Sequence, residues 1–258
     1  MLKKLYLLLF VALISSCGVK YETVPYFTDL PAGEDVEENI MNKSVIKIQK
    51  DDVLSIIATS PNAEANAIFN TANATSIGSG QSAGAAVNGF LVDNNGNVNV
   101  PYLGAVKVEG LTTSEARDKI EKALNVEGGF LKNAVVSLRI ANFKVSVLGD
   151  VLRPGVFPVQ NERISILDAL SLAGDLNITA LRDNVLLIRE TDGKREQVRV
   201  NLQQKDLLNS PYFYLKTNDV IYVQPGKNKY ASVDSSYRNT SIVLSAISVV
   251  VLALTRIF

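Results

Sequence analysis

Residues 142–174 read NFKVSVLGDVLRPGVFPVQNERISILDALSLAG and decide the fold of the second half of the chain. From Val145 to Val151, apolar residues alternate with polar or small ones, which is typical of a half-buried strand. Arg153-Pro154-Gly155 joins a residue that fixes φ to one that tolerates positive φ, so we expect the chain to reverse there and return as a second strand. Apolar residues then recur every three or four positions behind a capping Ser165, and Gly174 ends the pattern. The stretch therefore predicts a β-hairpin followed by a short helix.

Two segments of this stretch, VSVLGDVLRPGVFPV (145–159) and ISILDALSLAG (164–174), resemble the SLBB (soluble-ligand-binding β-grasp) motif. The usual motif has a second glycine after the helix, and this chain has Asp175 there, a residue type that can also end a helix. The resemblance implies a β-grasp-like SLBB domain with one SLBB unit, closed by the strand LKTNDVIYV (215–223). The motif residues that we expect to be structural are Gly149, Pro154 and Gly155.

Residues 1–17, MLKKLYLLLFVALISSC, are typical of a bacterial secretory signal. The last five of them resemble a lipobox, in which the cysteine is acylated and becomes the mature N-terminus. We prefer lipidation of Cys17 to an ordinary cleaved signal, because a lone cysteine in an exported protein has no disulfide partner. Gly18, and not an aspartate, follows the cysteine, which resembles the sorting pattern of outer-membrane rather than inner-membrane lipoproteins. We therefore expect a lipid-anchored outer-membrane protein with its body in the periplasm.

Composition excludes several classes of protein. The 258 residues are 47% hydrophobic with a mean hydropathy of +0.14, which allows one large or two small domains. Without residues 1–16 the net charge is about −2, so there is no basic field for nucleic acid. Histidine is absent, which excludes His-dependent catalysis and His-containing metal sites, and no P-loop occurs. We expect no enzyme activity, metal or cofactor, and interpret four carboxylates as turn or cap residues: Asp93, Asp150, Asp168 and Asp175.

Residues 17–44 contain prolines, acidic residues and little periodicity, so we predict an extended, lipidated tether. The alternative is that the aromatic pair Tyr26-Phe27 docks on a neighbouring surface. From Val45 to Ala58 the pattern predicts a strand, a turn at Lys50-Asp51-Asp52 and a second strand. Acidic residues before a strand are usually part of a turn, so we do not expect a metal site there.

Residues 61–89 are dominated by Ala, Asn, Ser and Gly. Such a stretch buries too little apolar area to offset the entropy lost on ordering, so it predicts a long mobile loop. Ile68 and Phe69 are its expected anchors. The loop either faces a lumen or a partner, or is a tolerated insertion.

Regular patterns resume at Phe90, with a turn at Asp93–Gly96 between strands and a helix that begins at Thr112. Thr112 and Glu115 have the spacing of a capping box, and apolar residues then mark one helical face.

Three segments, DDVLSI (51–56), DNNGNVNVPYLGAVKVEGLTTSEARDKIEKAL (93–124) and LKNAVVSLRI (131–140), are similar in order and spacing to the polysaccharide biosynthesis/export domain. Ala134 and Lys50-Asp51 replace usual turn residues and lie outside the expected core. The resemblance adds two structural motif residues, Pro101 and Gly104.

We therefore expect an α+β protein with two domains and a membrane-spanning C-terminal helix. The expected parts are a signal peptide at 1–16, a tether at 17–44, an export domain at 45–141, an SLBB domain at 142–226, a linker at 227–239 and the transmembrane helix at 240–258.

The last segment contains no charged residue from Asn239 to Thr255, and as a helix it would span about 25 Å of a hydrocarbon core of roughly 30 Å. Tyr237 and Phe258 lie where an aromatic belt would place them. Hydroxyl residues form one stripe, which a ring of about eight helices could turn toward a lumen roughly 15 Å wide. The alternative is that these hydroxyls bond back to their own helix. The expected pore-lining residues are Ser241, Ser245, Ser248 and Thr255.

The resemblance to Wza-type exporters implies a function. Copies of the chain would form a homo-oligomeric ring in the outer membrane that exports capsular or extracellular polysaccharide by passive conduction. An inner-membrane polysaccharide co-polymerase would be its partner. The alternative is an SLBB ligand-binding lipoprotein of the envelope without a pore. An enzyme of polysaccharide synthesis ranks last, because it would need a convergent carboxylate cluster.

Overall fold

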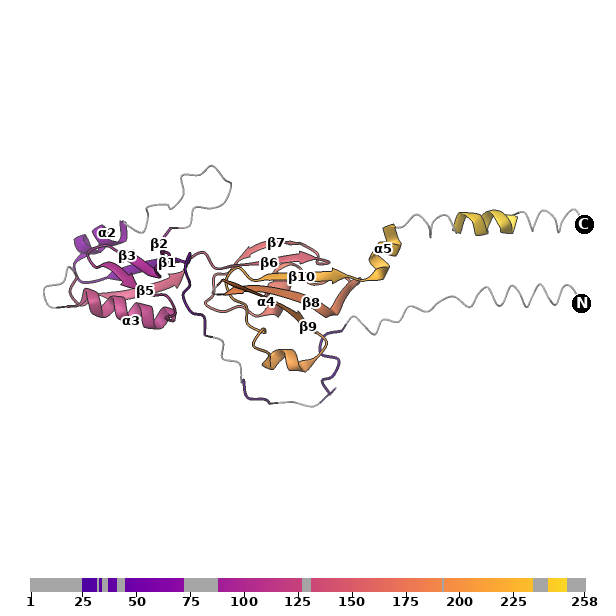
Figure 1. Cartoon of the computed structure of the whole chain (residues 1–258), viewed down its shortest axis with the longest axis horizontal. Coiled ribbons are helices and arrows are strands. Elements are labelled where there is room, and N and C mark those ends of the chain that lie inside the picture. The colour runs from indigo at the N-terminus through magenta and orange to yellow at the C-terminus, as the bar shows by residue number, and fades with distance from the viewer. Residues whose placement is uncertain are drawn as a thin grey trace, which may run out of the picture.

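The computed structural model describes residues 25–31, 33, 37–40, 45–71, 88–126, 131–191, 193–233 and 241–249. These residues form two domains that follow one another along the long axis of the molecule (Figure 1). Each domain combines a sheet with helices, so the expected α+β class is confirmed.

The first domain is built on a three-stranded antiparallel sheet in the order β2-β1-β5. A separate hairpin, β3-β4, and two helices complete its core, with α2 against β1 and α3 against β5. The elements in chain order are β1 Val53–Thr59, α2 Ala63–Thr71, β2 Phe90–Leu91, β3 Asn97–Val100, β4 Gly104–Lys107, α3 Thr113–Leu124 and β5 Val135–Ile140.

Local signals in the sequence explain these elements. In β5, Val136 and Leu138 are buried while Val135 is 66% exposed, as the alternation of a one-sided sheet requires. The capping box of α3 is confirmed: the Glu115 amide donates to the Thr112 hydroxyl at 3.1 Å, and the Glu115 carboxylate accepts from the Thr112 amide at 2.8 Å.

The second domain contains a five-stranded sheet in the order β7-β6-β10-β8-β9. The central pair, β6 and β10, is parallel, and the other pairs are antiparallel. Helix α4 packs on the face of the sheet that carries the core. The elements are β6 Lys144–Gly149, β7 Gly155–Pro158, α4 Ile166–Leu172, β8 Ala180–Thr191, β9 Lys194–Val200, the 3-10 helix η2 Lys205–Asn209 and β10 Val220–Pro225, followed by α5 Lys227–Val233.

The predicted hairpin and helix of residues 142–174 are confirmed as β6, β7 and α4. Ser165 and Asp168 form a second capping box at the start of α4. Gly174 follows the last residues of the helix with a φ of +78° and ends it, as expected. Asp175, in the place of the usual second glycine, also takes a positive φ, +71°, and its amide donates to the Leu170 carbonyl at 2.9 Å. The domains are joined at Asn142, whose side chain accepts from the Val53 amide at 2.9 Å and donates to the Asp51 carbonyl at 3.0 Å.

Two expectations for the first domain are wrong. The stretch predicted as a loop at 61–89 begins with helix α2, which buries Ala65 and Phe69 and leaves Ile68 49% exposed. Asn62 caps this helix by accepting from the Glu64 and Ala65 amides, so capping by asparagine and one buried ring order a segment of weak periodicity. Residues 72–87 lie outside the described part of the chain.

Residues 45–49 do not form the first of the two expected strands. The pairing there is one isolated bridge, Lys47 with Thr112, flanked by two backbone hydrogen bonds of Ile48. Ile48 is 1% exposed, so the apolar pattern reflects burial of a connecting segment against the loop before α3.

A buried ion pair in the second domain connects β8 to the segment that precedes β10. Arg189 of β8 contacts Asp219 at 2.7 Å, and the two side chains are only 6% and 1% exposed. Arg189 also donates to the Tyr214 carbonyl at 3.0 Å, and Asp219 accepts from the Lys216 amide at 2.8 Å. These bonds satisfy both charges and hold the segment that leads into β10.

Replacing Arg189 by methionine is expected to lower the free energy of unfolding by about 3–5 kcal/mol, because Asp219 would be left buried and unpaired. Urea unfolding of the full-length protein in mild detergent measures this change. Arg195→Met is the matched control, since Arg195 and Glu190 form an exposed pair at 2.6 Å, and its expected cost is at most about 1 kcal/mol. Equal effects of the two substitutions would contradict the role given to the buried pair.

Asp52 is a buried turn carboxylate at the start of β1. It is 2% exposed and accepts from the Gln49 amide at 2.7 Å. Burial raises the pKa of Asp52 to about 6; the nearby Asp51 adds to this, while the Gln49 bond opposes it. The folded protein therefore takes up a proton between about pH 6 and pH 4 that the unfolded chain does not.

Because the folded pKa is the higher one, ionisation of Asp52 costs stability as the pH rises through about 6. Asp52→Asn is neutral at every pH and keeps an acceptor for the Gln49 amide. We expect the variant to exceed the wild type in free energy of unfolding by on the order of 1–3 kcal/mol at pH 7.5 and to match it near pH 4. Urea unfolding at both pH values measures the difference; a variant that is less stable at pH 7.5 would refute this assignment.

Candidate functional site

Gly149 lets β6 end against the backbone of β10. Its φ is +96°, and a Cβ atom at this position would lie 2.0 Å from the carbonyl oxygen of Val223. The Asp150 amide donates to that same oxygen at 2.9 Å. A side chain cannot fit between the two parallel strands here, so glycine is required.

The other motif residues shape turns. Gly155 does not adopt positive φ: it pairs with Val147 at the start of β7, and a Cβ here would make an ordinary 3.8 Å contact with the Phe157 ring. Pro154 precedes it in the turn. Pro101 lies in the β3-β4 turn, and Gly104 begins β4 with a φ of +73°, a conformation that favours glycine.

The end of the second domain that lies away from the first is organised around Asp150 (Figure 1). We call it the distal end: residues 150–153, residues 172–182 and the start of α5. Asp150 is fully buried and accepts from Asn177 at 2.8 Å, from Thr179 at 2.6 Å and from Lys229 of α5. Although burial alone would raise the pKa of Asp150, the bonds from Lys229, Thr179 and Asn177 lower it below its ordinary value. The carboxylate therefore stays charged and holds α5 to the domain.

Residues 25–31, which we call the strap, pack on the second domain. The expectation of an extended tether is therefore wrong for these residues, and the alternative, docking of Tyr26-Phe27 on a neighbouring surface, is what the structure shows. The Phe27 and Thr28 amides donate to the carbonyls of residues 202 and 203 at 3.3 and 2.8 Å. Asp29 accepts from the Lys205 amide at 2.9 Å. This part of the expected tether is therefore an ordered piece of the domain that follows it.

Tyr26 joins the strap to the distal end. Its hydroxyl donates to the Asp175 carboxylate, and its ring centroid lies 5.6 Å from the guanidinium of Arg182. Arg182 is 4% exposed and donates to the carbonyls of Leu176 and Asn177. Burial and the bond to Asp175 raise the pKa of Tyr26, so the phenol remains a donor at physiological pH.

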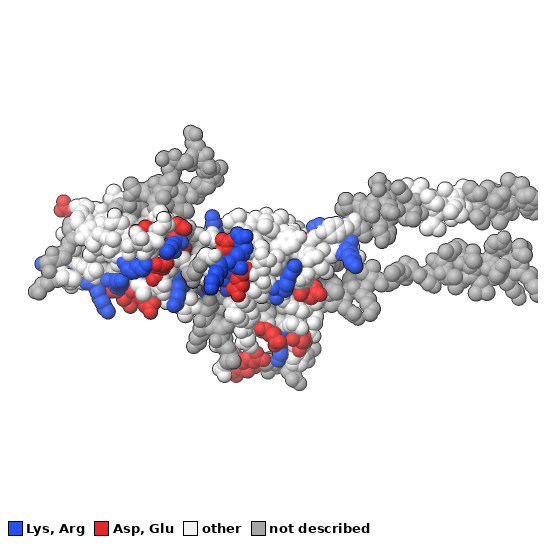
Figure 2. All heavy atoms as spheres, viewed as in Figure 1, with Lys and Arg blue, Asp and Glu red and all other residues white. Residues whose placement is uncertain are grey.

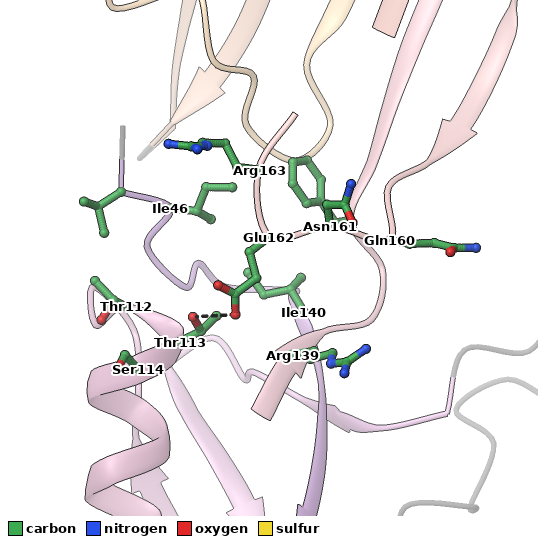
Figure 3. Close-up of a pocket in the computed structure, with 12 residues that line it drawn as sticks. Ile46, Thr112, Thr113, Ser114, Arg139, Ile140, Gln160, Asn161, Glu162 and Arg163 are labelled. Carbon is green, nitrogen blue, oxygen red and sulfur yellow. Dashed lines mark hydrogen bonds between the residues drawn. The ribbon is translucent and has the colours of Figure 1, made fainter. Parts of the chain in front are cut away.

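A hollow of ≈ 570 Å³ lies between the domains (Figure 3). Its lining combines hydroxyl, amide and charged side chains with Ile46, Ile140 and Phe143. Glu162 points to Thr113, whose hydroxyl donates to the carboxylate at 3.2 Å, and so connects the two domains across the hollow. The guanidinium groups of Arg139 and Arg163 point away from one another, so these two cations do not converge on a common point.

The expected pore-lining residues lie only partly in the described chain. Residues 241–249 are helical, and every side chain in them is exposed. The Ser245 hydroxyl donates to the Ser241 carbonyl at 2.9 Å and the Ser248 hydroxyl to the Leu244 carbonyl at 2.9 Å, as in the alternative that the hydroxyls bond to their own helix. Cys17 and Thr255 lie outside the described residues. Within them, no helix has the length and the apolar run that a membrane crossing needs, so the expected span at 240–258 is not seen.

The four carboxylates interpreted as turn or cap residues are spread over separate structural roles. Asp93 accepts from the Asn95 and Asn97 amides in its turn, Asp168 belongs to a capping box and Asp175 follows α4. Asp150 does more than shape a turn: it is buried and binds Asn177, Thr179 and Lys229, and its position in the sequence gave no sign of these partners. In the part of the chain that the structure describes, no group of three or more Cys, Asp or Glu side chains could hold a metal ion.

Comparisons with known proteins agree with this division of the chain. Residues 41–141 match the family model for polysaccharide biosynthesis/export protein, and residues 143–223 match that for the SLBB domain. The chain is 26% identical over 161 residues to the EPS I polysaccharide export outer membrane protein EpsA of Ralstonia solanacearum. The aligned residues cover 61% of this chain and 42% of that protein. The protein of the same name from Ralstonia nicotianae is 25% identical over 162 residues, with 62% and 42% covered.

The chain thus spans about two fifths of the length of the curated relatives that it matches. The two matched ranges follow one another from residue 41 to residue 223 and coincide with the two folded domains. The chain belongs to the polysaccharide biosynthesis/export family and carries an SLBB domain.

Proposed function

We propose that this protein is an outer-membrane lipoprotein that exports capsular or extracellular polysaccharide as one subunit of a homo-oligomeric channel. The names of the two relatives support export and the outer membrane. The single structural observation that carries the proposal is that the strap and α5 are both attached to the distal end of the second domain. Both extremities of the chain can therefore reach one membrane.

Chain length sets how close that membrane must be. Cys17 precedes Pro25 of the strap by eight positions, so a lipid on Cys17 lies no more than about 30 Å from the strap. The apolar segment that begins at Ser241 follows Val233 of α5 by the same number of positions. Acyl chains on Cys17 and a span at 240–258 would thus enter the bilayer on the same side of each subunit.

The outer face of the second domain's sheet supports assembly into a ring. Leu148 and Tyr222 are direct cross-strand partners on β6 and β10, and Val156 lies on the same face of β7. These side chains are 45%, 37% and 60% exposed, and the surface over these strands is mostly uncharged (Figure 2). An exposed apolar sheet face of this kind is typical of a surface that packs against a neighbouring subunit.

Hydroxyls at 241, 245, 248 and 255 would face the lumen of a helical ring. A serine hydroxyl that donates to its own helix keeps its lone pairs, so Ser245 and Ser248 can still accept hydrogen bonds from water in a lumen. The first domain lies at the opposite end of the molecule from α5, where it could meet an inner-membrane polysaccharide co-polymerase (Figure 1). In this mechanism the protein makes and breaks no covalent bond, and the polysaccharide passes through the channel by passive conduction.

Deleting residues 241–258 is expected to abolish surface polysaccharide, because the channel would lose its span, while Cys17 still anchors the truncated protein. Cell-surface polysaccharide and membrane fractionation measure the two effects in a strain that depends on this gene. Normal export from the truncated protein would exclude the pore.

A second variant separates the pore from assembly. Leu148→Lys with Tyr222→Lys keeps the anchor and the terminal helix but places two charges on the apolar sheet face. We expect it to reach the membrane, to run as a monomer in mild detergent where the wild type is a ring, and to export no polymer. A wild type that is itself monomeric in mild detergent would instead favour the ligand-binding lipoprotein, for which the interdomain hollow is the site to test.

A further inference from the structure

Three large apolar side chains are exposed together at the distal end. Leu152, Leu172 and Ile178 are 65%, 43% and 66% exposed. They lie on two segments that pair with each other: the Leu152 amide donates to the Asp175 carbonyl at 3.1 Å, and the Arg153 amide donates to the Ala173 carbonyl at 2.8 Å. The exposed side chains are therefore neighbours in space, although they are up to 26 positions apart in sequence.

These residues are held on a rigid frame. Val151, Ala173 and Leu176, from the same two segments, are 4%, 0% and 6% exposed and belong to the core of the second domain. The Asn177 side chain bonds to the Val151 carbonyl at 3.2 Å and to Asp150. The inward residues fix the backbone, so the apolar outward residues cannot turn into the core. Single exposed apolar residues are common, but a fixed group of three is the kind of patch that marks an interaction surface.

The position of this patch identifies what covers it. The strap contacts the distal end through Tyr26 and Asp175, and α5 contacts it through Lys229 and Asp150, so the chain enters and leaves the domain at the same end as the patch. The strap begins eight positions after Cys17, and an uncharged segment follows α5. Two exposed cations also lie at the distal end, Arg153 beside Leu152 and Lys227 at the start of α5, and both could bind lipid phosphates.

We propose that the distal end rests on a phospholipid surface, with Leu152, Leu172 and Ile178 inserted at the boundary between headgroups and acyl chains. This inference rests on the membrane anchorage given under the proposed function and adds to it a direct contact between the folded domain and the bilayer. With the distal end on the membrane, the long axis of the molecule points away from the membrane surface. The contact also fixes the distance between the second domain and the bilayer. Each subunit adds a few apolar side chains to the interface, so a ring adds many.

Tryptophan fluorescence tests the proposal, because the chain contains no tryptophan. Ile178→Trp introduces a single indole at the patch, and Leu152→Trp is a second variant at the same place. Val135→Trp is the matched control, since Val135 is also 66% exposed but lies on β5 of the first domain. The acylated full-length variants are reconstituted into vesicles of phosphatidylethanolamine and phosphatidylglycerol, with or without lipids brominated near the carbonyl end of the acyl chain.

We expect the Ile178→Trp and Leu152→Trp proteins to float with the vesicles and to show blue-shifted emission. Brominated lipid should quench most of this emission, because an interfacial side chain is buried to a depth of about 5–10 Å, near the brominated carbons. The Val135→Trp protein should float but keep its emission. If all variants float and neither patch indole is quenched, the inference is wrong while the anchorage stands. Equal quenching of the control would also overturn it, because the whole molecule would then lie flat. Proteins that fail to float would contradict the proposed anchorage itself.

Discussion

Two carboxylates, Asp150 and Asp175, determine where the chain enters and leaves the second domain. Asp150 is fully buried and binds Lys229 of α5, while Asp175 follows helix α4 and accepts a hydrogen bond from the hydroxyl of Tyr26 in the strap. Their backbone segments pair with each other, so the two attachments cannot move apart without opening the domain. This constraint brings segments more than 200 positions apart in sequence to one end of the molecule, and the proposed attachment of both segments to one membrane depends on it.

The family motif supplies the geometry that makes this possible. At Gly149 the chain passes within hydrogen-bonding distance of Val223, so β6 and β10 end together at the distal end. The buried pair of Arg189 and Asp219 fixes the start of β10. The five-stranded sheet therefore lies between the interdomain junction at Asn142 and the distal end.

Sequence reasoning located the elements whose signals are local. Capping boxes at Thr112 and Ser165, the Asp93 turn and the period-two pattern of β6 are each determined by residues within a few positions, and the structure contains all of them. The export and SLBB domains were expected from the resemblance of these segments to two family motifs. Helix α2 was missed because its periodicity is weak and its stability comes from Asn62 and a single buried ring. Asp150 and Arg182 were not recognised as organising residues, since their partners come from distant segments and no local pattern announces them.

The strap is part of the folded second domain and so fixes, at the distal end, the place where the N-terminal segment leaves the domain. Amide hydrogen exchange of the full-length protein tests it most directly, because the Thr28 amide bonds to the Gln203 carbonyl at 2.8 Å. We expect the Thr28 amide to exchange slowly, at a rate similar to that of the neighbouring Leu202 amide, which donates to the Arg182 carbonyl at 2.8 Å. Exchange of Thr28 at the rate of a free chain, while Leu202 stays protected, would contradict it.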